Sequence, residues 1–377
     1  MERFFVYTSV IYTSVSEINP IVWDSVISKD KPYLTHAYLA SMESSISDNY
    51  YCLVFDCDGP VACACFYFVE TDLGLFLPEG HPVYKFLKFI RKSLPRFLKV
   101  NILECGPPGM SGQGIVFREG LTISKRRQVL DGIITELETL GKKLRPTMTV
   151  IRDFKVGEFE ELSSFGFKAI PNLEEAEMDL VWDSFDSYVN SFKSHYRSIV
   201  KKEIAKNSCI RVEKTSNFEQ HSAKMADLWY QTSSKSNEYR REVLKPDYFY
   251  KLSSLGDKVR AVLLWREDTL VAFSLSLLGE STSYAMWMGA DYSLNTSLPL
   301  VFGVYYETIK EAIEQKKQRL FLGETTYGLK LRVGATLIPI NMYLKCRYPW
   351  ITRFLAFIAK KTTPQQKVLK KNVFKLT

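Results

Sequence analysis

Three strand-like segments, a helix and a further short strand follow one another within residues 259–323, and this order constrains the fold more than any other feature of the chain. The three segments lie between residues 259 and 289 and are separated by Glu267-Asp268 and Gly279-Glu280, which predicts an antiparallel meander. Apolar residues then recur at helical spacing from Pro299, before the short strand at 319–323. A helix between neighbouring strands predicts a right-handed crossover that makes them parallel.

The same alternation of strands and helices occupies the first half of the chain. A hairpin is predicted at Asp58-Gly59, a helix at 125–140, and a strand at 175–182 that closes this half. A long helix at 185–204 then opens the second half. Because 377 residues are too many for one ordinary core, we expect two related α/β halves with mixed sheets. Their expected boundaries are listed in order: 1–182, 183–345 and a basic amphipathic tail at 346–377.

Composition excludes several classes of protein. Hydrophobic residues make up 46% and charged residues 24% of the chain, as in a globular protein that folds throughout. Seven cysteines and four histidines lack metal-type spacing, so we expect no metal site and reduced thiols. The N-terminus is a poor signal peptide, and no run of about 18 apolar residues occurs. We therefore expect a cytoplasmic protein that is neither secreted nor integral to a membrane.

The net charge of +8 is concentrated at the C-terminal end. No acidic residue follows Glu324, whereas eleven lysines and arginines do, so the rest of the chain is slightly acidic and DNA is not an expected partner. Residues 350–358 also carry an aromatic and aliphatic stripe at helical spacing. Two interpretations stay open: a last helix docked on its own core, or a peripheral contact with an anionic membrane at its inner face.

Three motifs in order resemble one family. They are Gly323-Glu324-Thr325-Thr326-Tyr327-Gly328-Leu329-Lys330 continuing to Gly334-Ala335 and Pro339, then Tyr196-Arg197 with the basic residues after it, and Trp23 with residues 33–39 and Glu43. Together they are similar to motifs of the FemAB-like and BioF-like acyltransferases in the GNAT-like superfamily, over the chain to about residue 345. The resemblance implies tandem GNAT-like halves and transfer of an acyl group to an amine.

Transfer to an amine needs a base for the ammonium proton and donors for the developing oxyanion. Glu324 follows the second of two central parallel strands, where open α/β sheets place their sites, and is a candidate base or a helix cap. His195, beside the Tyr196-Arg197 pair, is the second candidate base or a solvated surface residue. Tyr327 is a candidate proton donor to a leaving thiolate, and Lys330 a candidate partner of an anion or oxyanion.

Donor and acceptor binding involve other positions. Asn295, Thr296 and Ser297 precede the crossover helix, whose N-terminus suits a phosphate, although the usual Gly-rich GNAT loop is missing there. Arg197 and Arg332 are candidate partners of an anionic donor. Substrate-binding candidates are the aromatic residues Tyr196, Tyr284 and Trp287. Strand alternation predicts that Tyr284, Met286 and Met288 share one face and that Trp287 points to the other, toward either substrate or core.

Three functions from different classes remain. The first is an N-acyltransferase without a permanent cofactor, using acyl-CoA or acyl carrier protein as co-substrate and a primary amine, such as a long-chain lipid amine, as acceptor. The second is a Fem-type ligase that uses aminoacyl-tRNA in cell-wall synthesis. The third is a non-catalytic binding protein with the same fold. A glycine-rich stretch at 106–114 is interpreted as a structural loop because no phosphate-binding partner follows it.

Overall fold

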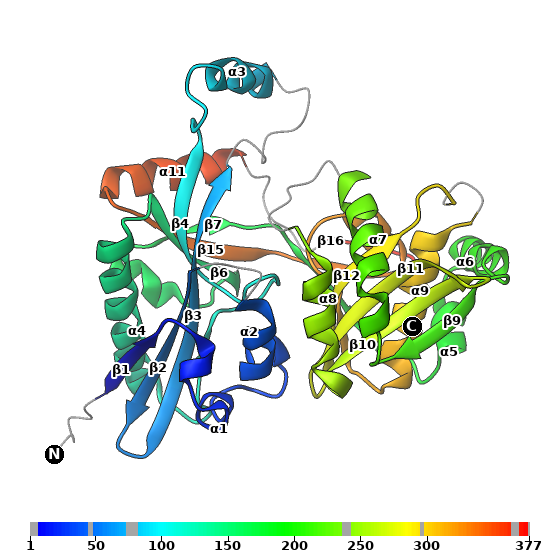
Figure 1. Cartoon of the computed structure of the whole chain (residues 1–377), viewed down its shortest axis with the longest axis horizontal. Coiled ribbons are helices and arrows are strands. Elements are labelled where there is room, and N and C mark those ends of the chain that lie inside the picture. The colour runs from blue at the N-terminus through cyan, green and yellow to red at the C-terminus, as the bar shows by residue number, and fades with distance from the viewer. Residues whose placement is uncertain are drawn as a thin grey trace. The chain divides into compact units, whose positions relative to one another are not determined.

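The computed structural model describes residues 7–43, 48–72, 82–235, 243–294, 298–362 and 369–375. The chain divides into two compact units (Figure 1). The first comprises the described parts of 1–172 and 340–366, and the second those of 173–236, 242–339 and 367–377. Each contains one mixed sheet with helices packed on it, which confirms the predicted α/β class.

The sheet of the first unit has the order β1-β2-β3-β4-β6-β15-β7, with β5 paired to β3. Its strands are β1 (Thr8–Tyr12), β2 (Asn49–Asp56), β3 (Gly59–Asp72), β4 (Lys99–Cys105), β5 (Ile115–Phe117), β6 (Met148–Lys155), β7 (Lys168–Pro171) and β15 (Ile340–Cys346). The predicted hairpin joins β2 to β3, where Gly59 has a φ of 124°. β4 and β6 are parallel, with a helix between them in the chain.

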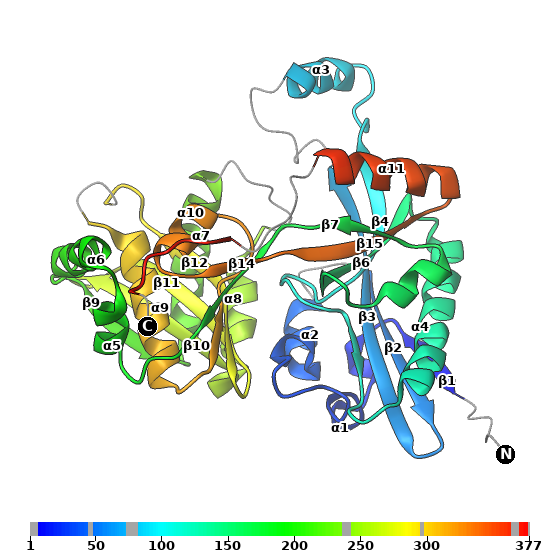
Figure 2. The same cartoon turned by 180° about the vertical axis from the view of Figure 1, so that it is seen from behind.

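That helix, α4 (Ile123–Leu144), covers the predicted 125–140 segment and runs along the sheet (Figure 2). Its buried residues Val129, Ile133 and Leu137 recur at helical spacing and pack on β2, β3 and β6 in one core. The unit's other helices are α1 (Pro20–Asp24), α2 (His36–Glu43), α3 (Pro82–Arg91) and α11 (Pro349–Thr362), with 3₁₀ turns at Val15–Glu17, Pro32–Leu34 and Glu160–Phe165.

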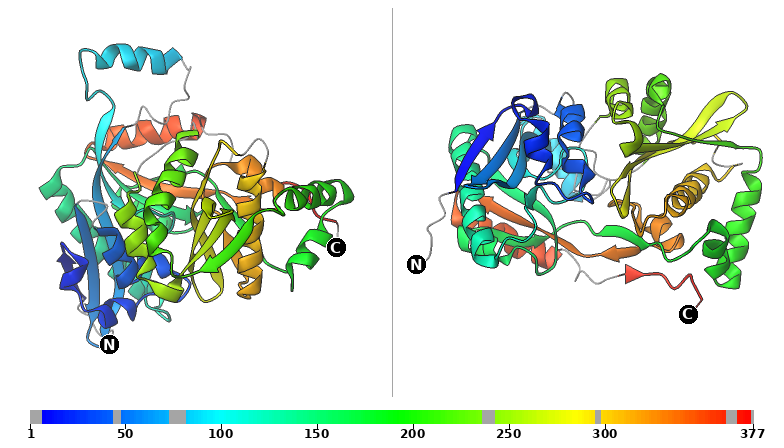
Figure 3. Two further views of the ribbon diagram at one scale, coloured as in Figure 1. Left: turned by 45° about the vertical axis from the view of Figure 1, so that its right-hand side comes forward. Right: turned by 90° about the horizontal axis from the view of Figure 1, so that it is seen from below.

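The second unit has the strand order β16-β14-β8-β13-β12-β11-β10-β9 (Figure 3). Its strands are β8 (Glu175–Asp179), β9 (Arg211–Thr215), β10 (Val259–Arg266), β11 (Thr269–Leu278), β12 (Thr282–Ala290), β13 (Arg319–Phe321), β14 (Thr336–Ile338) and β16 (Leu369–Lys370). Its helices are α5 (Phe185–Ser191), α6 (Ser194–Lys206), α7 (Ser222–Lys235), α8 (Pro246–Ser253), α9 (Leu300–Glu314) and α10 (Tyr327–Arg332), with 3₁₀ turns at Glu219–His221 and Gly256–Lys258. The predicted meander and crossover are confirmed: β10, β11 and β12 are antiparallel, and β12 is parallel to β13 across α9.

The two sheets repeat one strand order but exchange one strand. β15 lies between β6 and β7 in the first unit, and β8 lies between β13 and β14 in the second, each antiparallel to both neighbours. The expectation that 175–182 closes the first half is therefore wrong. The connections into these strands, 172–174 and Pro339, lack the Asn-Gly type of turn that would fold the chain back as a tight hairpin.

The predicted helix at 185–204 is broken into α5 and α6 at Phe192 and Lys193, whose backbones are extended. The break forms pairing sites for the C-terminal segment, because Lys193 N–H donates to the Val373 carbonyl over 2.9 Å and Lys375 N–H to that of Ser191. Phe192 is thereby fully buried against Phe374, with ring centroids 4.7 Å apart. Tertiary packing has overridden a helical apolar period here.

The C-terminal segment combines both of its expected behaviours. α11 docks on β7 and β15 and buries Thr352 and Ala356. Its other face leaves Trp350, Phe354 and Phe357 exposed beside basic residues. Among the described residues, no helix is both long and apolar enough to cross a bilayer.

Candidate active site

The second unit opens between its two central parallel strands. β12 and β13 pair over three positions only, Thr282 to Tyr284 against Arg319 to Phe321. β12 then continues to Ala290, and in the described part of the chain no other strand pairs with this edge. Because β13 ends so early, the peptide groups of β12 beyond Tyr284 face a gap in the sheet ladder. A ligand backbone can bond to such groups.

A β-bulge lies on β12 beside this opening. Leu275 pairs with Trp287 and Ser276 with Ala285, so Met286 is an extra residue on β12. Bulges re-aim side chains and are enriched next to active sites. Ala285 and Met288 consequently both pack against the core beneath α9. The prediction that Tyr284, Met286 and Met288 share one face is wrong, because simple alternation fails across the bulge.

Trp287 points to the opposite face, toward α7 and α8. Its indole N–H donates to the Tyr248 hydroxyl over 2.6 Å, and its ring meets Trp229 edge-on at 6.2 Å. α7 lies directly on the strand, since a Cβ on Gly289 would sit 2.6 Å from the backbone of Leu228. Sequence reasoning missed Trp229 and Tyr248 as neighbours of the site, although both stand at buried positions of amphipathic helices.

The loop after β13 carries Glu324 and an unusual backbone. Gly323, Thr325 and Thr326 have φ values of 75°, 68° and 51°, in the left-handed region. For the two threonines this costs about 1 to 3 kcal/mol each, and such strain concentrates at functional sites. Glu324 itself is half-buried. The structure therefore holds a carboxylate-bearing residue in a constrained loop at the carboxyl end of β13.

Lys330 holds this loop in place. Its side chain on α10 is 4% exposed, and its ammonium donates to the carbonyl oxygens of Gly323, over 3.0 Å, and Glu324. A charged donor fixing two backbone carbonyls is a strong and directional restraint. Lys330 is thus engaged with its own loop, an arrangement that the sequence did not predict.

We expect Lys330→Met to lower the free energy of unfolding of the second unit by about 1 to 3 kcal/mol, because the two buried carbonyls lose their donor. The side-chain volume is nearly kept, so packing changes little. Urea denaturation measures the change, and hydrogen exchange in peptides covering 322–327 should become faster. Lys224→Met, at a surface ion pair with Asp227, is the control. Equal stability and unchanged exchange in Lys330→Met would contradict this role.

Tyr327 is the first residue of α10, and its hydroxyl donates to the Glu174 carbonyl over 3.1 Å. Burial raises the pKa of Tyr327 far above its ordinary value, and the negative charges of Glu174 and Glu324 raise it further. The phenol therefore stays protonated at neutral pH and is able to donate a hydrogen bond or proton.

Arg332 is engaged in a partly buried cluster. Its guanidinium pairs with Glu203 of α6 and lies over the Phe302 ring, 3.5 Å from the centroid. The Tyr306 hydroxyl donates to the same carboxylate over 2.7 Å, and burial followed by Glu203 raises its pKa. This cluster joins α6, α9 and α10 around one ion pair, and sequence reasoning named only Arg332 among its members.

The remaining predicted residues lie on or near α6 and the start of α9. His195 is exposed with its ring edge-on to Tyr196, 5.3 Å away, and Tyr196 is half-buried against the core. Arg197 donates to the Asn190 carbonyl over 3.5 Å. Tyr284 packs on Phe321. Asn295, Thr296 and Ser297 lie outside the described residues.

Comparison with known proteins agrees with this architecture. Residues 150–326 match the FemAB-like family model, described as peptidoglycan biosynthesis/recognition. The structure superposes on FemX with a TM-score of 0.59 and 13% identity, covering 93% of this chain and 100% of FemX. The chain is a GNAT-like transferase of the FemAB type.

Two further structures share the tandem GNAT-like fold. One is the C-terminal domain of a protein named lysylphosphatidylglycerol synthetase from Agrobacterium fabrum, with a TM-score of 0.56, 10% identity, and coverage of 92% and 97%. The other is a tandem GNAT protein from the clavulanic acid biosynthesis pathway, with a TM-score of 0.51, 8% identity, and coverage of 90% and 98%.

In sequence, the chain is 26% identical over 318 residues to a protein named 8-amino-7-oxononanoate synthase 2 from two strains of Mycobacterium tuberculosis. The match covers 80% of this chain and 40% of that protein. The chain thus spans less than half the length of the curated relatives that it matches.

The first GNAT-like unit fills with its own side chains the place where the second opens. Arg152 on β6 is buried and pairs with Glu104 and Asp153, while the Tyr67 hydroxyl donates to Glu104. Arg152 also donates to the carbonyls of Pro107, over 2.6 Å, and Met110, over 2.8 Å. These bonds anchor the glycine-rich stretch that follows β4.

The glycines of that stretch serve close packing. A Cβ on Gly106 would lie 2.5 Å from the Arg152 Nε, and one on Gly114 would lie 2.4 Å from the Gly106 nitrogen. The Gly112 N–H donates to the Asp153 carboxylate over 2.8 Å. An internal arginine thus bonds the loop carbonyls and an internal carboxylate one loop N–H, which supports the interpretation as a structural loop.

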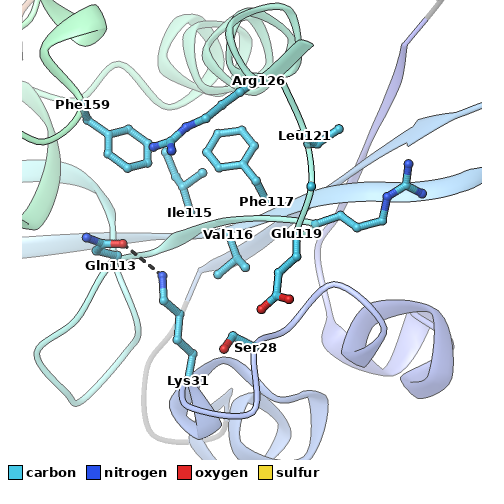
Figure 4. Close-up of a pocket in the computed structure, with 12 residues that line it drawn as sticks. Ser28, Lys31, Gln113, Ile115, Val116, Phe117, Glu119, Leu121, Arg126 and Phe159 are labelled. Atoms are coloured by element: carbon cyan, nitrogen blue, oxygen red, sulfur yellow. Dashed lines mark hydrogen bonds between the residues drawn. The ribbon is translucent and has the colours of Figure 1, made fainter. Parts of the chain in front are cut away.

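The first GNAT-like unit also contains a cavity of about 310 Å³ next to β5 (Figure 4). The Lys31 ammonium donates to the Gln113 side chain over 3.0 Å, and burial lowers the pKa of Lys31. The Arg126 guanidinium lies between the rings of Phe117 and Phe159, 4.8 and 4.4 Å from their centroids. The cavity thus combines two cationic side chains with aromatic walls, which suits a small anionic molecule with an apolar part.

Proposed function

We propose that the second GNAT-like unit is an N-acyltransferase that moves an acyl group from an acyl-CoA or acyl carrier protein thioester to a primary amine. The observation that carries the proposal is the opening between β12 and β13, with the bulge at Met286 on one side and the constrained Glu324 loop on the other. An open edge of β12 can hydrogen-bond the amide groups of a pantetheine arm in the manner of an added strand.

In this proposal the acceptor nitrogen attacks the thioester carbonyl carbon, a C–N bond forms and the C–S bond breaks. Glu324 takes the proton that the nitrogen loses, and Tyr327 donates a proton to the departing thiolate. His195 is the alternative base. Lys330 acts through the loop that it holds. Trp287 and Tyr284 line the acyl side.

The donor's phosphates are assigned to the N-terminal end of α9, where residues 295–297 precede the helix. Arg197 and Tyr196 on α6 are proposed to contact the donor or acceptor from the next helix. Arg332 is proposed to hold α6 and α10 in register through Glu203.

We propose a lipid with a long-chain primary amine as the acceptor. Two observations support this class. The compound named for the Mycobacterium tuberculosis relative is an aliphatic chain with an amine beside a ketone, and α11 exposes an aromatic face beside basic residues, as expected for a peripheral contact with the inner, cytoplasmic membrane surface.

The Fem-type alternative, with aminoacyl-tRNA as donor, is favoured by the FemAB-like match and by the likeness to FemX. The two functions differ in the donor, because an aminoacyl ester on tRNA and an acyl thioester deliver different groups. A non-catalytic role is the third possibility.

The deciding experiment incubates the purified chain with acyl-CoA, acyl carrier protein thioesters or aminoacyl-tRNA, each with amines that include sphingoid bases and cell-wall precursors. Mass spectrometry then identifies amide products. An amide formed from a thioester and a long-chain amine is the expected result. Product from aminoacyl-tRNA alone would replace the proposal with the Fem-type function, and no product with any donor would leave only the non-catalytic role.

A further inference from the structure

α3 and the residues after it form a cationic, aromatic surface in the first unit. No acidic residue occurs between Glu79 and Glu104, whereas six basic residues do: Lys85, Lys88, Arg91, Lys92, Arg96 and Lys99. Phe86 and Phe89 are 62% and 69% exposed, one turn apart on the helix, and Leu94 and Phe97 after it are also exposed. Large aromatic residues grouped in this way at a surface mark an interaction site.

The structure fixes which side of α3 faces outward. Leu87 is 2% exposed, and Arg91, one turn later, bonds the Asp72 carboxylate of β3 with two nitrogens, one over 2.8 Å. Arg91 also donates to the Phe97 carbonyl, which ties down the segment after the helix. With Leu87 and Arg91 turned to the unit, helical geometry turns Phe86 and Phe89 away from it, flanked by Lys88 and Lys92.

α11 exposes a similar face at the same end of the first unit (Figures 1 and 2). Its inner residues Ile351 and Leu355 pack with Val69 and Val100, which belong to β3 and β4. Asp72, the anchor of α3, lies three residues after Val69 on the same strand. Both helices are therefore attached to the same ends of β3 and β4.

We infer that α3, residues 92–99 and α11 form one docking surface for a membrane rich in anionic lipid. Charge complementarity selects this occupant, because the two segments place many cations and no carboxylate of their own beside exposed aromatic rings. Aromatic residues insert at the headgroup level while lysine and arginine bind anionic headgroups. The inference adds α3 to the contact proposed above and does not depend on the acyl acceptor.

The test is co-sedimentation of the full chain with vesicles of pure phosphatidylcholine or of phosphatidylcholine and phosphatidylglycerol at 70:30. We expect binding to the anionic vesicles, which added salt weakens, and at least tenfold weaker binding to the neutral ones. Phe86→Ser with Phe89→Ser should lower the partition coefficient at least tenfold. The matched control is Ile123→Ser with Val156→Ser, which removes two exposed apolar residues elsewhere in the same unit.

A charge arm compares Lys88→Gln with Lys92→Gln against Lys142→Gln with Lys143→Gln, an exposed pair at the end of α4. Only the first pair should weaken binding. Circular dichroism confirms that each variant is folded. Equal binding by the phenylalanine variant and wild type would overturn the inference, as would a dimer that this variant dissociates while neither protein binds vesicles. Binding needs no acyl donor, so an inactive but vesicle-bound protein separates this inference from the proposed function.

Discussion

Replacing Arg152 with methionine is expected to lower the free energy of unfolding of the first unit by about 3 to 5 kcal/mol. The guanidinium is the partner of Glu104 and Asp153, both almost completely buried, and it also satisfies the carbonyls of Pro107 and Met110. Methionine fills much of the volume but leaves two buried carboxylates and two carbonyls without this donor.

Urea denaturation followed by hydrogen exchange in peptides covering 102–105 and 148–155 measures this loss in the first unit specifically. Arg211→Met removes an ion pair with Glu213 that is more than one-third exposed on both sides, and we expect a change below about 1 kcal/mol there. A loss below about 1 kcal/mol for Arg152→Met would show that the network contributes no more than a surface pair.

Glu324→Gln is expected to lower kcat about 10²- to 10⁴-fold for the proposed transfer, because the amide cannot accept the ammonium proton. The substitution keeps size and hydrogen-bonding shape, so KM for the donor should change little. Single-turnover measurement of amide formation separates the chemical step from product release. Glu267→Gln, at an exposed turn between β10 and β11, is the control for loss of one negative charge.

His195→Ala run in parallel distinguishes the two candidate bases. If Glu324→Gln keeps more than half of the wild-type kcat while His195→Ala loses activity, the base is His195 and Glu324 is a structural residue of the loop. A folded Glu324→Gln protein is shown by an unchanged urea midpoint.

Local sequence patterns predicted much of the second sheet. The turns at Glu267-Asp268 and Gly279-Glu280 and the apolar period after Pro299 are local signals, and the meander and crossover follow them. The break at Phe192 has no such signal, since its cause is burial against Phe374, far along the chain. The exchange of β8 and β15 is equally non-local.

For the site, the sequence identified the loop at Glu324 but not its restraints. Lys330 carries the charge expected of an anion-binding residue, and only the structure shows that its ammonium bonds the carbonyls of Gly323 and Glu324. Met286 gives no sign of a bulge, because a register shift depends on the pairing of two strands. The catalytic roles of Glu324, His195 and Tyr327 stay predictions.

The reciprocal placement of β8 and β15 has a consequence for synthesis of the protein. The first sheet cannot be completed until residues 340–346 have left the ribosome, so the edges of β6 and β7 wait, unpaired, through translation of most of the chain. Exposed strand edges invite pairing with other chains. Folding of the first unit is thus coupled to completion of the second, and a fragment that ends after β7 would lack a central strand of its own sheet.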